Sequence, residues 1–110
     1  MFDLIAFVKA RRPTISQKTE TELHKIQFLA EQFCRSDLIP VVLAEVDINS
    51  ENALRELKKE FLGTARNEHV WALGSKDDFD SDVHQRNSDF YRTLADAMQI
   101  IIDDIQKGNS

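Results

Sequence analysis

Short apolar runs alternate along the chain with longer stretches in which apolar residues recur at helical spacing. The three apolar runs are Ile5–Val8, Val41–Ile48 and Val70–Leu73. The stretches of helical period that follow them cover 16–35, 50–62 and 88–107. A short apolar run bounded by turn residues is typical of a buried strand. The pattern therefore predicts three units, each made of one strand and one amphipathic helix.

Turn and capping residues mark the boundaries of these units. Pro13 closes the first strand, because proline has no amide to donate and restricts the residue before it. Thr14 or Ser16 is expected to cap the first helix, and Asn49-Ser50 to cap the second. Gly63 is expected to end the second helix in a left-handed conformation, and Gly74 to close the third strand.

Alternating strands and helices predict a parallel sheet with crossover helices. The expected fold is a single α/β domain over 1–110, with a small, mainly parallel sheet of three strands in the order 2-1-3. Its connectivity would be βαβαβα, ending in a long C-terminal helix. Three strands leave sheet edges to be covered, and the last helix is apolar over a wide arc, which favours a homodimer.

Composition and charge narrow the function classes. The chain has 110 residues, 42% of them hydrophobic and 30% charged, and a net charge of −5. This acidic balance disfavours binding to nucleic acid, because the molecule repels phosphate. The single cysteine, Cys34, cannot form an internal disulfide, which favours the cytoplasm. No apolar run approaches the ~20 residues of a membrane span, so no membrane association is expected.

The most suggestive polar segment follows the first predicted strand. Arg11, Arg12, Thr14 and Ser16 stand just before a predicted helix N-terminus, where free amides and a partial positive charge favour anions. Arginine adds planar, bidentate recognition of phosphate or carboxylate. These four residues are the predicted anion or ligand site. The alternative is that the two arginines pair with the acidic loop over 76–82 or face solvent.

A second segment, 76–82, is rich in aspartate. Asp78 and Asp80 are the residues that would hold a magnesium ion, which needs few protein ligands. His84 or Asp80 would then act as the acid or base. The alternative is a solvated acidic loop that caps the last helix, with no metal and no cofactor, and this is the interpretation we adopt.

Two function classes remain open from the sequence. The first is a small regulatory or binding module that recognises a protein or a phosphorylated, nucleotide-like small molecule and performs no chemistry. The second is a small magnesium-dependent, phosphate-handling enzyme, similar to a nucleotide hydrolase, that uses Arg11 and Arg12 with Asp78 and Asp80. The second class requires the basic and acidic segments to meet at one rim of the sheet.

Overall fold

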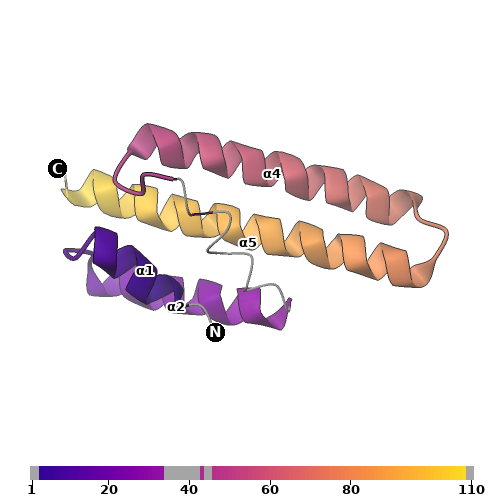
Figure 1. The fold of residues 1–110 in the computed structure, drawn as a ribbon, viewed down its shortest axis with the longest axis horizontal. Helices are drawn as coiled ribbons and strands as arrows, with labels where there is room; N and C mark the ends of the chain where they lie inside the picture. Colours follow the sequence, from indigo (N-terminus) through magenta and orange to yellow (C-terminus); the bar gives the residue numbers. More distant parts are fainter. Residues whose placement is uncertain (1–2, 34–42, 44–45, 109–110) are drawn as a thin grey trace.

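A computed structural model of the chain describes residues 3–33, 43 and 46–108. Over these residues the protein contains helices and no strand. The helices are α1 (Leu4–Arg11), α2 (Gln17–Gln32), α4 (Glu51–Gly74) and α5 (Asp78–Gly108) (Figure 1). The predicted α/β fold, with a three-stranded parallel sheet in the order 2-1-3, is therefore wrong, and the protein is a helical bundle.

The predicted first strand is helix α1. Its N-cap is Asp3, whose carboxylate accepts a hydrogen bond from the amide of Ala6. Leu4, Ile5 and Val8 are buried, and their spacing places them on one face of a helix. Because the apolar run is short and continuous, its period cannot separate a buried strand from a buried helix. The capping aspartate was the signal that favoured a helix.

The predicted third strand, Val70–Leu73, lies inside α4. This helix runs without interruption through Gly63, which is exposed and has no left-handed φ. Within the predicted strand only Ala72 is buried, whereas Val70, Trp71 and Leu73 are exposed. The strand prediction assumed that a cluster of large apolar residues must be buried, and here it is not.

Two of the other predicted boundaries, the starts of α2 and α4, agree with the sequence. Of the expected capping residues, Ser16 caps α2 and Ser50 caps α4, each through its hydroxyl. The last helix begins at Asp78, ahead of the two starts that the sequence suggested, Ser88 and Ser81. Half of the predicted second strand, Val41–Ile48, lies outside the described residues, and the described half contains no strand.

Helix α5 is the centre of the bundle. It packs against α4 on one side and against α2 on the other, and α1 packs on α2 (Figure 1). The core consists of fully buried apolar side chains from all four helices and from the segment before α4, among them Leu4, Leu23, Leu43, Ile48, Leu54, Phe90, Leu94 and Ile101. Burial of this apolar surface is the main contribution to the stability of the fold.

Helix α2 covers only half of α5. Near the start of α2, Thr19 forms a hydrogen bond with Asp104, which lies near the end of α5. Near the end of α2, Leu29 lines a cavity with Asp96, which lies only eight residues before Asp104. The hairpin of α4 and α5 continues past α1 and α2 toward its own connecting loop (Figure 1). We call this distal part, residues 66–89, the arm.

Over the described residues, no helix is long and apolar enough to cross a bilayer.

Gly63→Ala distinguishes the observed helix from the predicted helix end. Inside an exposed helix, alanine is better than glycine by about 0.5–1 kcal/mol, and a Cβ at this position would meet nothing within 4 Å. We therefore expect urea unfolding to show a higher free energy of unfolding for the variant, with unchanged helical circular dichroism. A loss of stability would indicate a left-handed cap at Gly63 and contradict a continuous α4.

Candidate functional site

Arg12 and Asp104 form a nearly buried ion pair between the end of α1 and α5. The guanidinium Nη2 lies 2.8 Å from Oδ2 of Asp104, and the two side chains are 14% and 7% exposed. Its Nη1 donates to Oδ1 of Asn49 at 2.9 Å, and Asn49 in turn donates to the carbonyl of Arg11 at 3.1 Å. These contacts join α1, the segment before α4 and α5.

The second carboxylate oxygen of Asp104 is also engaged. Oδ1 accepts hydrogen bonds from the backbone amide of Ser16 at 3.2 Å and from the hydroxyl of Thr19 at 2.8 Å. Burial raises the pKa of Asp104, but the hydrogen bonds from Arg12, Ser16 and Thr19 and the charge of Arg12 outweigh it. The pKa therefore lies below its ordinary value of 3.8, and Asp104 is ionised at neutral pH.

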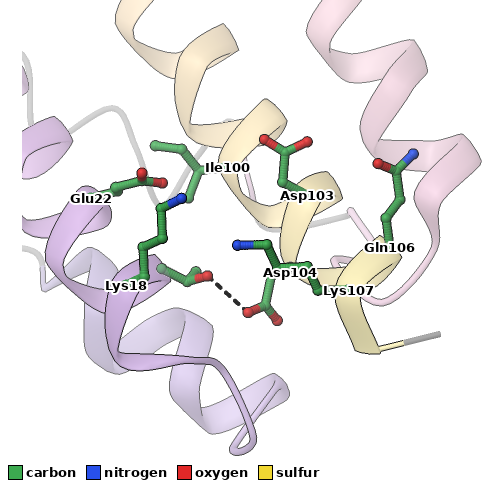
Figure 2. A pocket seen from close by; sticks show the side chains of 8 residues that line it. Lys18, Glu22, Ile100, Asp103, Asp104, Gln106 and Lys107 are labelled. Carbon is green, nitrogen blue, oxygen red and sulfur yellow. Dashed lines mark hydrogen bonds between the residues drawn. The ribbon is translucent and has the colours of Figure 1, made fainter. Parts of the chain in front are cut away.

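Two cavities adjoin this ion pair. The larger, about 320 Å³, opens between α2 and α5 and has a mixed-charge lining (Figure 2). Its lining residues are Lys18, Thr19, Glu22, Ile100, Asp103, Asp104, Gln106 and Lys107. The smaller, about 260 Å³, is lined by Arg12, Thr14, Ser16, Asp104, Lys107 and Gly108.

Three of the four residues predicted to bind an anion thus share a cavity with the carboxylate of Asp104 and the cationic Lys107. The guanidinium of Arg12 is already paired with the carboxylate of Asp104. The last turn of α5, which carries a partial negative charge, ends here as well. Arg11 has a different environment, with its guanidinium 3.7 Å from the centre of the Phe7 ring. The predicted anion site stays a prediction.

The acidic segment lies at the opposite end of α5. Asp78 and Asp80 are exposed in its first turn, whereas the partner of Arg12, Asp104, is 24 residues beyond Asp80. At 1.5 Å per residue this separates them by about 36 Å. The structure does not bring the basic and acidic segments together, because that proximity depended on a parallel sheet. No group of three His, Cys, Asp or Glu side chains suited to a metal occurs among the described residues. Magnesium at Asp78 and Asp80 remains a prediction.

Within the arm, the side chain of His84 on α5 contacts two residues of α4. Its Nδ1 donates to Oε2 of Glu68 at 2.5 Å, and its ring meets the edge of Trp71 with the ring centres 5.6 Å apart. His84 therefore links the two helices, and the catalytic role suggested for it stays untested.

Small and polar side chains hold the interior of the arm. The hydroxyl of Ser88 donates to the carbonyl of Ala65 at 2.8 Å, and that of Ser81 donates to the carbonyl of Ala72 at 2.9 Å. His69 donates from Nδ1 to Oε1 of Gln85 at 2.9 Å. These contacts bring α4 and α5 together without a large apolar core.

The exterior of the arm carries the large apolar side chains instead. Five of them are exposed: Val70, Trp71, Leu73, Phe79 and Val83. Phe79 and Val83 lie on the face of α5 that also carries Phe90, Leu94 and Ile101, because the steps of four and seven residues follow the helical period. The last three are fully buried, whereas Phe79 is 72% and Val83 is 37% exposed.

This apolar exterior was missed because the sequence interpretation placed 76–82 in a loop. The signal was present, since steps of four and seven continue back from Phe90 to Val83 and Phe79. Comparison with known proteins gives no guidance: no family, curated protein or solved structure matches the chain.

Asp104→Asn tests the ion pair. The change leaves the charge of Arg12 nearly buried and unpaired, so we expect a loss of about 3 kcal/mol in the free energy of unfolding at neutral pH. Asp103→Asn, at an exposed neighbour on α5, should change it by less than about 0.5 kcal/mol.

The same pair predicts a pH dependence. Because the pKa of Asp104 is lowered by folding, its stabilisation is complete above its unfolded pKa and is lost as the pH falls through the folded value, below 3.8. Urea unfolding at several pH values should therefore show the difference between the protein and Asp104→Asn shrinking as the pH falls below 3.8. A difference that does not change with pH would contradict the assigned ionisation.

Proposed function

We propose that the chain is a protein-interaction module that binds a helical segment of a partner on its arm. One observation carries this proposal: the apolar stripe of α5 continues through Val83 and Phe79 beyond the part that α2 covers. In the covered half the stripe belongs to the core, and in the arm the same face meets water.

The energetics favour a docking surface. Clustered apolar residues exposed on a folded protein typically mark an interaction site. Aromatic side chains are the usual anchors of such sites, and burying one large apolar side chain stabilises by about 1.5–3 kcal/mol. Phe79 and Trp71 are 72% and 57% exposed, so most of this gain is still available to a partner.

The geometry favours a helix as the docked element. In the covered half, α2 lies along α5 as the third helix beside the hairpin (Figure 1). In the arm only α4 and α5 are present among the described helices. A partner helix with apolar residues at i, i+3, i+4 and i+7 would take the equivalent place.

The other function classes have less support. No observation favours the magnesium-dependent enzyme, whose proposed residues lie far apart. A phosphorylated small molecule would have to compete with Asp104 for Arg12. A cytoplasmic location and a regulatory role stay predictions from the sequence.

Site-specific photo-crosslinking in the cells that produce the protein tests the docking function. We expect a benzoylphenylalanine at position 79 or 83 to give one discrete cross-linked product, because these positions lie in the proposed interface. Position 28 is the matched control, since Phe28 is also exposed, at 61%, but lies on α2.

The product at position 83 should be lost in Phe79→Ser and retained in Phe28→Ser. Both substitutions should change the free energy of unfolding by less than about 0.5 kcal/mol, because both side chains face solvent. Products of equal yield at positions 28, 79 and 83, or none at 79 and 83, would reject the arm as a docking surface.

A further inference from the structure

The arm is the acidic part of the molecule. Between Arg66 and Asp89 the chain carries six carboxylates and three cationic side chains, not counting histidine. This gives the arm a net charge of −3, more than half of the −5 of the whole chain, in less than a quarter of its length. A field of this sign raises the local concentration of cations near the arm.

Three of these carboxylates lie beside the apolar stripe. These three exposed carboxylates are those of Asp78, Asp80 and Asp82. In the sequence, the first two flank Phe79 and the third directly precedes Val83. None of the three forms a salt bridge within the described part of the chain. Their charges are consequently available to a partner. Asp77 differs, because its carboxylate accepts the amide of Phe79 and caps α5.

We infer that the arm binds a cationic amphipathic helix, an inference that rests on the proposed docking function. Its apolar face would cover Phe79, Val83 and Trp71, and its lysine or arginine side chains would reach the flanking aspartates. Long cationic side chains suit this arrangement, since their methylene stems cover apolar surface while the charge stays in water. The aspartates would act mainly on the association rate and on the choice of partner.

The same charge argues against two other occupants. A second copy would bring two arms of net charge −3 together, and like charges across an interface oppose association. The homodimer expected from the sequence is therefore not favoured on this surface. An anionic lipid surface would be repelled for the same reason.

Tryptophan fluorescence provides a direct test. Trp71 is the only tryptophan of the chain and is 57% exposed on the arm, so its emission should shift to shorter wavelength when a helix covers it. The probes are two designed amphipathic peptides of about 15–20 residues, long enough to form a helix. One has leucine and lysine, and the other has glutamate in place of every lysine.

We expect the lysine peptide to bind at least about tenfold more tightly than the glutamate peptide at low salt, with a smaller ratio at high salt. Replacing Asp78, Asp80 and Asp82 by asparagine should weaken the lysine peptide about fivefold to tenfold. The matched control, Glu56→Gln with Asp96→Asn and Asp103→Asn, changes the net charge equally outside the arm and should have little effect.

The outcomes separate the two proposals. If both peptides bind equally and Phe79→Ser weakens both, the arm docks helices but the inferred charge of the partner is wrong. If neither peptide shifts the emission of Trp71, the inference is also overturned, and the cross-linking result decides the docking function independently. If sedimentation shows a dimer that Phe79→Ser dissociates, the occupant is a second copy, which also overturns the inference.

Discussion

The ion pair of Arg12 and Asp104 joins positions 92 residues apart and connects the end of α1 to the C-terminal part of α5. A nearly buried ion pair is stable only if its remaining atoms are hydrogen-bonded. Ser16, Thr19 and Asn49 satisfy most of these atoms, and they come from the start of α2 and from the segment before α4. Because Asp104 lies near the end of α5, the pair holds α1 and α2 over the C-terminal half of that helix.

The arm is left uncovered because α2 is attached at the C-terminal end of α5 and is much shorter than α5. Helix α2 has 16 residues and α5 has 31, so a helix fixed at one end of α5 cannot reach the other. The uncovered half has a different composition from the core. Its interior is closed by small residues and hydroxyl groups such as Ser81 and Ser88, whereas aromatic side chains lie outside. The surface proposed for docking therefore results from a mismatch between two helices, not from a separate structural element.

Much of the local structure could be predicted, where side chains contact the backbone close by in sequence. Ser16 and Ser50 indicated two helix starts correctly, because a capping hydroxyl binds an amide three residues later. The short apolar runs were misread, because a buried strand and a buried helix look alike over so few residues. Gly63 was misread as a helix end, although an exposed glycine costs a helix only about 1 kcal/mol.

The candidate site could be predicted only in part. The local pattern grouped Arg11 with Arg12, Thr14 and Ser16, and only the last three line one cavity, whereas Arg11 lies over the Phe7 ring. The same pattern indicated that the segment around Asp80 would be acidic and exposed. Only the tertiary structure decided that the partner of Arg12 is Asp104 and that Phe79 faces water. These outcomes depend on contacts between residues far apart in the chain and on how far α2 extends along α5. A local apolar pattern records which side chains favour burial, but the relative position of the helices determines which of them are covered.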